Sequence, residues 1–217
     1  AQHSKTVVLF GGAAVKNAQV NAGGIGNHSP RQQLMKLREA GVKVVNISPI
    51  RDDVVEEVGA QWLACRPGSD TAIMLGMAHT LVAETLHDTA FLEKYTVGFE
   101  KFLPYLMGES DGQPKDADWA ESLSEISAET IRELARDLAR DRSLVGISWS
   151  LQRQESGEQT WWMITALGAM LGHIGLPGGG IGYGYGCIHN MGFGGRKIPN
   201  YRMGAFGLEI GERSAPK

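Results

Sequence analysis

Four apolar runs constrain most strongly how this chain can fold. Residues 6–10 and 42–47 are continuous runs rich in β-branched side chains, which is typical of strands buried on both faces of a parallel sheet. Residues 31–40 between them carry apolar side chains at helical spacing, and Gly41 suits the left-handed position that follows a helix. The start of the chain therefore predicts a strand–helix–strand unit with a right-handed crossover.

The same alternation continues and predicts the fold class. Residues 62–65 and 144–147 indicate a third and a fourth strand, with a long helix over residues 71–85 and another that begins after Ser127. Strands that alternate with helices form a parallel sheet covered on its faces. We therefore expect an α/β fold, a mostly parallel, Rossmann-like sheet flanked by helices.

The chain divides in composition near its end. We expect residues 1–177 to form the Rossmann-like domain. Residues 178–217 are crowded with glycine and show no helical or strand period, so they predict an irregular extension that packs on the rest of a larger protein. The chain starts at Ala1 without a signal peptide, which suggests a processed end or the boundary of a fragment.

Composition argues against several classes of partner and site. The net charge of −3 over 217 residues gives no reason to expect nucleic acid or an anionic membrane. Cys65 and Cys187 are far apart and form no CxxC pair, which disfavours a zinc ribbon, an iron–sulfur cluster and a disulfide framework. The apolar run at residues 161–176 is slightly short for a bilayer and contains His173, so it favours a core helix.

Polar clusters follow three of the predicted strands. Ser48-Pro49-Ile50-Arg51 follows the second strand, Arg66-Pro67-Gly68-Ser69-Asp70 the third, and Ser148-Trp149-Ser150-Leu151-Gln152-Arg153 the fourth. Ligands of open α/β sheets bind beyond the carboxyl ends of the strands, which lie at one edge of the sheet. We therefore expect the three clusters to form a single cradle.

Each cluster has residue types that suit a nucleotide, and each also has a simpler explanation. The carboxylate of Asp70 at a helix start could accept two hydrogen bonds from a guanine edge; the alternative is that Ser69 and Asp70 only cap the helix. Ser48 and Arg51 suit a phosphate or ribose better than the diol of NAD; the alternative is a strand that ends at Pro49 with a solvated arginine.

The loop after the fourth strand is the sharpest cluster. Trp149 can stack on a heterocycle, Gln152 can bind an amide-like ring edge, and Arg153 can donate several N–H groups to an oxygen atom. The alternative is a buried tryptophan beside a surface arginine. After the first strand there is no G-x-G-x-x-G motif, but Lys16 and Asn17 could reach a phosphate or sugar, unless they are simply exposed.

The ordered set of these clusters resembles one known family. Ser48-Pro49-Ile50-Arg51, Arg66-Pro67-Gly68-Ser69-Asp70, Trp149 to Arg153, Gly157-Glu158-Gln159 and the run from Ala169 through Leu176-Pro177-Gly178-Gly179-Gly180 are similar to an internal segment of the dimethyl sulfoxide reductase family. These are bacterial S- and N-oxide reductases that carry molybdenum bis(molybdopterin guanine dinucleotide). The similarity covers essentially the whole chain.

The resemblance implies a role for each cluster. Asp70 would pair with guanine, and Trp149 and Arg153 would face the pterin and the substrate as the catalytic residues. The metal ligand of the family, a serine of an earlier domain, is not identified in this chain. The remaining residues implied to bind the cofactor are Lys16, Asn17, Ser48, Pro49, Arg51, Gly68, Ser69, Ser150, Gln152, His189 and Asn190.

The resemblance thus implies a molybdenum-dependent oxidoreductase that removes oxygen from an S- or N-oxide, with the isolated chain inactive. Its partners would be the remaining domains of the same enzyme and a small oxide substrate, without nucleic acid or a membrane span. Its compartment would be the periplasm or, alternatively, the cytoplasm. Two other functions stay open: a nicotinamide-dependent dehydrogenase domain, which should prefer adenine over guanine nucleotides, and a non-enzymatic binding module.

Overall fold

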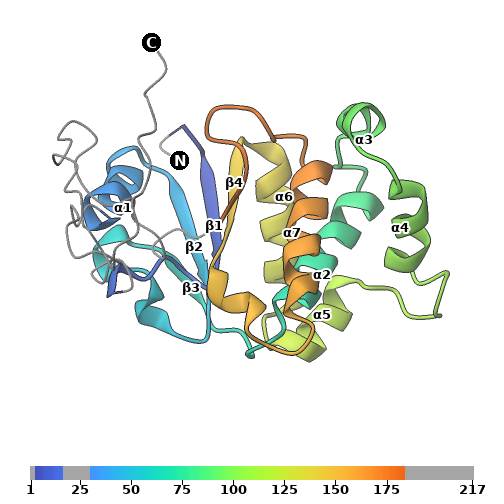
Figure 1. Cartoon of the computed structure of the whole chain (residues 1–217), viewed down its shortest axis with the longest axis horizontal. Coiled ribbons are helices and arrows are strands. Elements are labelled where there is room, and N and C mark those ends of the chain that lie inside the picture. Colours follow the sequence, from blue (N-terminus) through green and yellow to red (C-terminus); the bar gives the residue numbers. More distant parts are fainter. Residues whose placement is uncertain (1–2, 17–29, 184–217) are drawn as a thin grey trace, which may run out of the picture.

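The computed structural model describes residues 3–16 and 30–183 and shows a parallel sheet between helices (Figure 1). The sheet has five strands in the order β3-β2-β1-β4-β5, and all neighbouring strands are parallel. The α/β class predicted from the sequence is confirmed. The strands are β1 Thr6–Phe10, β2 Lys43–Ile47, β3 Gln61–Leu63, β4 Ser143–Ile147 and β5 Gly180–Tyr183.

β1 lies in the middle of the sheet because the chain adds strands on opposite sides of it. β2 and β3 extend the sheet in one direction, and β4 and β5 extend it in the other. Phe10 pairs with Ile47 on one side and with Ile147 on the other, so the three central strands end level. The direction in which strands are added thus reverses at β1. At such a point α/β proteins bind ligands beyond the carboxyl ends of the two neighbouring strands, here β1 and β4.

The strand β5 lies in the segment expected to be irregular. Gly180–Tyr183 pairs with Leu144–Ile147 as a fourth parallel neighbour pair, and Gly168 of α7 lies against the side chain of Ile181. The expectation that no strand follows residue 178 is therefore wrong for these four residues. The division of the chain into residues 1–177 and 178–217 stays a prediction.

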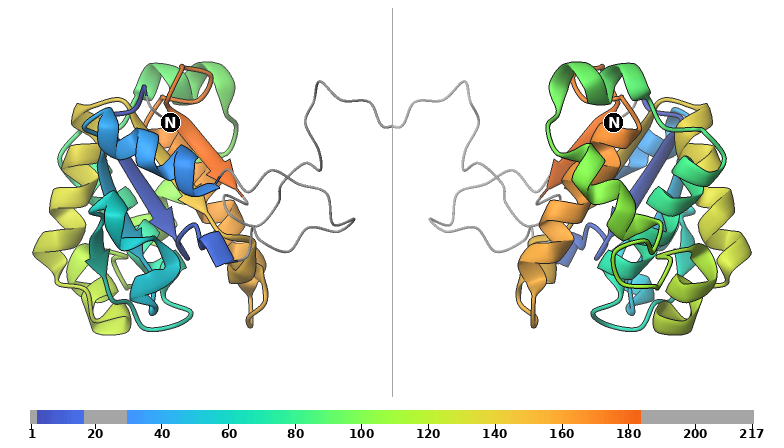
Figure 2. Two further views of the ribbon diagram at one scale, coloured as in Figure 1. Left: turned by 90° about the vertical axis from the view of Figure 1, so that its left-hand side faces the viewer. Right: turned by 90° about the vertical axis from the view of Figure 1, so that its right-hand side faces the viewer.

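In the described part of the chain, helices cover both faces of the sheet in two outer layers (Figure 2). One face packs on α1 and η3, through side chains such as Val7 and Val44. The other face, through Val8 and Val45, belongs to the core that also contains α2, α5, α6 and α7. The helices are α1 Pro30–Glu39, η2 Arg51–Asp53, η3 Glu56–Val58, α2 Asp70–Ala83, α3 Thr89–Tyr95, α4 Phe99–Leu106, α5 Ala117–Ser124, α6 Ala128–Arg140, η4 Trp149–Gln152 and α7 Gly157–Met170.

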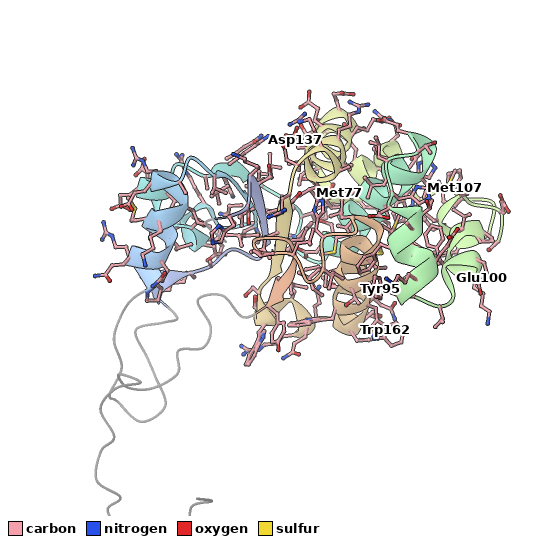
Figure 3. All side chains as sticks on the ribbon, turned by 90° about the horizontal axis from the view of Figure 1, so that it is seen from above. Met77, Tyr95, Glu100, Met107, Asp137 and Trp162 are labelled. Carbon is pink, nitrogen blue, oxygen red and sulfur yellow. The ribbon has the colours of Figure 1, made fainter. Side chains whose placement is uncertain are left out.

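α2 is the central helix of the thicker layer. Met77 is fully buried inside this layer, whereas Tyr95 and Trp162 lie on its outer surface (Figure 3). A β-carbon placed on Gly76 would lie 2.8 Å from the β-carbon of Ala120 in α5, so the absence of a side chain there lets the two helices approach closely. α2 is thereby fixed along its length, and its first turn lies at the carboxyl edge of the sheet.

The segment between α4 and α5 is held by a buried lysine. The ammonium group of Lys115 donates to a carboxylate oxygen of Asp111, at 2.7 Å, and to the backbone oxygen of Gln113. It also lies 4.6 Å from the ring centre of Tyr105 and 5.7 Å from that of Trp119. The cation is thus surrounded by an acid, a carbonyl and two aromatic faces, which together replace the water lost on burial.

None of the helices in residues 3–16 and 30–183 combines the length and the apolar character that crossing a bilayer requires.

Candidate functional site

The turns after β1, β2 and β4 are joined by backbone hydrogen bonds. The N–H of Gly11 donates to the carbonyl of Ile47 at 2.8 Å, and the N–H of Ser148 donates to the carbonyl of Phe10 at 2.8 Å. A β-carbon placed on Gly11 would lie 2.8 Å from that of Ser148, so only glycine permits this approach. The strand ends therefore converge as the sequence predicted.

The turn after β3 meets the loop after β4. A β-carbon placed on Gly68 would lie 3.3 Å from the amide oxygen of Gln154, and the hydroxyl of Thr71 lies 3.0 Å from that of Thr160 in the first turn of α7. The starts of α2 and α7 consequently lie side by side. Both helix starts present backbone N–H groups and positive dipole ends, which favour an anionic group.

Asp70 lies between Gly68 and Thr71 and is 3% exposed. Burial raises the pKa of its carboxyl group from the ordinary value of 3.8 to about 6, and a hydrogen bond with its own backbone N–H opposes this rise. No other hydrogen bond of this carboxylate occurs within the described residues. A ligand that donates hydrogen bonds here would therefore relieve a costly buried charge.

The start of α2 does not show the side-chain cap by Ser69 that was the alternative to a role in ligand binding. Ser69 occupies the N-cap position, but its hydroxyl donates to the carbonyl of Arg66 at 2.6 Å and makes no capping hydrogen bond. Asp70 is the first helical residue rather than the cap. Cys65 lies close by, and burial, with the charge of Asp70, raises the pKa of its thiol to about 12, so this thiol is unreactive at neutral pH.

The turn after β2 holds Ser48 by its own contacts. The hydroxyl of Ser48 donates to Asp53 at 2.7 Å and accepts the N–H of Ile50, while its carbonyl accepts the indole N–H of Trp62 at 2.8 Å. The hydroxyl is thus used within the turn. Pro49 and Arg51 are exposed, and Arg51 is free to meet a ligand from solvent.

A pocket of about 500 Å³ opens beside this turn. Asn46 at its floor is buried; its amide N–H donates to the carbonyl of Arg51, and its amide oxygen has no hydrogen-bond partner within the described residues. The pocket therefore combines a guanidinium and an indole with polar backbone. It is lined by Asn46, Arg51, Asp52, Val54, Val55, Glu56, Gly59, Ala60 and Trp62.

The loop after β4 forms the short helix η4. Trp149 is half-buried, while Ser150, Gln152 and Arg153 are exposed. The hydroxyl of Ser148 accepts the N–H of Ser150 and so begins this turn. The backbone that carries Trp149 is thereby fixed, and Arg153 is exposed just beyond the carboxyl end of β4.

Residues 1–211 match the molybdopterin oxidoreductase family. The chain is 48% identical over 192 residues to biotin sulfoxide reductase of Cereibacter sphaeroides, covering 88% of this chain and 26% of that protein. It is 47% identical over 185 residues to dimethyl sulfoxide/trimethylamine N-oxide reductase of Rhodobacter capsulatus, covering 85% and 22%. The chain belongs to the molybdopterin oxidoreductase family.

A solved structure agrees with this assignment. Acetylene hydratase from Pelobacter acetylenicus superimposes with a TM-score of 0.61 and 26% identity, over 81% of this chain and 22% of that chain. The curated relatives named above are reductases of S- and N-oxides, so the predicted membership of the dimethyl sulfoxide reductase family is confirmed. The chain spans between 22% and 26% of the length of these relatives.

Membership of the molybdopterin oxidoreductase family indicates a molybdenum–pterin cofactor. The carboxyl edge of the sheet has features that suit a nucleotide: Asp70 is a buried acceptor that receives no hydrogen bond from another of the described residues, and two helix starts lie beside it. Within residues 3–16 and 30–183, no three His, Cys, Asp or Glu side chains lie together so that they could hold a metal ion.

Not every predicted residue of this oxidoreductase chain can be placed. Asn17, His189 and Asn190 lie outside the described residues. Lys16 is exposed, and its ammonium group lies 3.6 Å from a carboxylate oxygen of Asp53. The cofactor role of each of these four residues stays a prediction.

Sequence reasoning missed two residues that shape the edge. Asp53 accepts a hydrogen bond from the hydroxyl of Ser48, and the indole N–H of Trp62 donates to the carbonyl of Ser48. Neither belongs to the clusters that the resemblance singled out. The one available signal was position, because each lies within a few residues of a strand end.

Proposed function

We propose that this chain is part of a molybdenum-dependent reductase of S- or N-oxides, in which it binds one guanine dinucleotide of a bis(molybdopterin guanine dinucleotide) cofactor. The single observation that supports the guanine dinucleotide is the buried carboxylate of Asp70 between the starts of α2 and α7. A guanine edge offers two adjacent N–H donors, which would pair with the two carboxylate oxygens. The phosphates would lie at the helix starts, with Ser48, Arg51 and Ser69 near the ribose.

Reduction is favoured by the relatives rather than by the fold. The same fold occurs in a protein named for hydration, so architecture alone does not determine the reaction. The relatives at 46–48% identity are named for the reduction of biotin sulfoxide, dimethyl sulfoxide or trimethylamine N-oxide. We propose a substrate of this class, with methionine sulfoxide as a further candidate, for the full-length protein.

The cofactor would supply two-electron and oxygen-transfer chemistry, and the loop after β4 would supply the polar environment. The half-buried indole of Trp149 offers a flat face for the pterin, and Gln152 offers an amide for its ring edge. The exposed guanidinium of Arg153 would donate hydrogen bonds to the oxygen of the substrate. Positive charge would then lie where negative charge builds up during the reaction.

In the full-length protein, Arg153→Ala is expected to lower the turnover of a sulfoxide or N-oxide by about 100-fold, because one donor to the reacting oxygen is lost. The molybdenum content per protein should stay that of the wild type, since Arg153 is exposed and supports no other contact among the described residues. Steady-state kinetics together with metal analysis measure both effects.

Arg142→Ala is the matched control, because Arg142 lies at the opposite end of β4 and donates to the carbonyl of Pro177. Its turnover should equal that of the wild type. If the Arg153 variant also keeps wild-type kinetics, Arg153 does not contact the substrate.

We propose the periplasm as the compartment of the full-length protein. Fractionation of cells that express it, with a cytoplasmic marker enzyme as control, tests this directly. Recovery with the cytoplasmic marker would overturn the proposal.

A further inference from the structure

Asp53 links two turns that are far apart in the sequence. One of its carboxylate oxygens accepts the hydroxyl of Ser48 in the turn after β2, at 2.7 Å. The other lies 3.6 Å from the ammonium group of Lys16, which follows β1. Its backbone carbonyl accepts the N–H of Ala13 at 2.8 Å, so side chain and backbone reach the same turn after β1.

The turn after β1 lies so close to the turn after β2 that no side chain fits at Gly12. Gly12 has φ +69°, a conformation that favours glycine, and a β-carbon placed there would lie 2.5 Å from the β-carbon of Asp53. The side chain of Asp53 is only 13% exposed although it lies in a surface turn. A carboxylate this enclosed is stabilised by the hydroxyl and the ammonium group that point at it.

Both turns form the carboxyl edge of the sheet. The turn after β1 also contacts Ser148 through Gly11, and the turn after β2 ends at Arg51 beside the pocket of about 500 Å³. Trp62 holds the carbonyl of Ser48 from β3, and the N–H of Gly11 holds the carbonyl of Ile47 from the side of β1, so the backbone of the turn is bonded on both sides. The side chain of Asp53 adds the link that joins the hydroxyl of Ser48 to Lys16.

We propose that Asp53 is a positioning residue for the nucleotide: it contacts no ligand, and it fixes Ser48 and Lys16 at the spacing that the nucleotide requires. This inference rests on the proposed cofactor and names the residue that prepares its cradle. At metal sites, removal of the polar partners behind the ligating residues commonly changes affinity by about 10- to 100-fold, and we expect an effect at the lower end of this range for the nucleotide.

The test compares three variants of the full-length protein. Asp53→Asn keeps the shape and an acceptor for Ser48 but removes the charge that holds Lys16. Asp53→Ala removes both links, while the backbone bond from Ala13 remains in each variant. Glu39→Gln is the matched control, because Glu39 is exposed at the end of α1, carries the same charge and makes no hydrogen bond or ion pair of its side chain with other described residues.

The measurement is the rate at which cofactor leaves the protein in dilute urea, read as molybdenum and guanine nucleotide remaining after desalting. Release should be about tenfold faster for Asp53→Ala and about threefold faster for Asp53→Asn. It should be unchanged for Glu39→Gln. The melting temperature of the cofactor-free Asp53→Asn form should equal that of wild type, because asparagine keeps the shape and the acceptor for Ser48, whereas that of Asp53→Ala should fall because the hydroxyl of Ser48 loses its acceptor.

The outcomes separate this inference from the proposed function. Wild-type protein without molybdenum or guanine nucleotide would overturn both. Wild-type protein that carries them, with release from Asp53→Ala as slow as from Glu39→Gln, would overturn the role of Asp53 alone. A melting temperature of the cofactor-free Asp53→Asn form that falls in proportion to retention would show a purely structural role and would also overturn it.

Discussion

Asp70→Asn is expected to stabilise the cofactor-free chain at pH 7 by at most about 3 kcal/mol, although Asp70 is the residue to which guanine pairing is assigned. Burial raises the pKa of this carboxyl group from 3.8 to about 6, so its charged form is disfavoured in the folded protein, and the rise corresponds to about 3 kcal/mol. An amide of the same shape removes that cost.

The pH dependence of the stability difference between Asp70→Asn and wild type shows whether the buried charge of Asp70 causes it. The folded state holds the proton of Asp70 more tightly than the unfolded state, so its contribution to stability falls as the pH rises from about 4 to about 6 and is constant above that. The difference between Asp70→Asn and wild type should therefore be largest at pH 7 and close to zero below pH 4. Urea unfolding of the 217-residue chain at both pH values measures it.

The same substitution should have the opposite effect on the cofactor. An asparagine side chain offers one acceptor and one donor where the guanine edge needs two acceptors, so retention of guanine nucleotide by the full-length protein should fall by about 100-fold. Asp52→Asn, which removes an exposed charge, should change neither quantity. If Asp70→Asn is less stable than wild type at pH 7, the carboxylate has a donor and is not an acceptor held ready for a ligand.

Lys115→Ala is expected to destabilise the chain by about 3 kcal/mol. The substitution removes the bonds of the ammonium group to Asp111 and Gln113 and its contacts with Tyr105 and Trp119, and it leaves a cavity where a buried side chain was. Unfolding in urea measures the loss. Asp116 follows Lys115 and caps α5, so the start of this helix should also loosen when Lys115 is lost. Protease cleavage between α4 and α5 should therefore become faster.

Lys115→Met separates charge from packing. Methionine keeps most of the stem and fills the space between the two rings, so it should cost about 1 kcal/mol. If both variants lose the same free energy of unfolding, the whole contribution of Lys115 to stability comes from its charge. A wild-type stability for both would show that Lys115 does not hold this segment.

The sequence predicted best those elements whose environment is uniform. β1, β2 and β4 are buried on both faces, and their continuous apolar runs reported them to within a residue at each end. β5 was missed because Gly180–Tyr183 is short and contains two glycines, and its pairing is decided by β4 rather than by its own residues. α5 is not among the helices expected from the sequence, because it is short and begins directly after the polar residues 108–116, which contain two glycines and a proline.

Within the site, the position of Asp70 and of the loop from Trp149 to Arg153 after strands was predicted from the sequence and is observed, while their roles toward the cofactor stay predictions. The alternative in which the hydroxyl of Ser69 caps α2 is not observed, because this hydroxyl donates to the carbonyl of Arg66. Asp53 was missed because its importance arises from Ser48 and Lys16 together, and that arrangement exists only after the strands have been ordered in space.

The central place of β1 gives the crevice two walls of separate origin. β2 and β3 carry the turns assigned to the nucleotide, whereas β4 carries the loop assigned to the pterin and the oxide. The two sides meet at β1 and where Gly68 of the turn after β3 lies against Gln154. Substitutions of the exposed residues of the loop after β4 would therefore change substrate choice while the turns after β2 keep their structure, which is an arrangement suited to a family of enzymes that diversify around one prosthetic group.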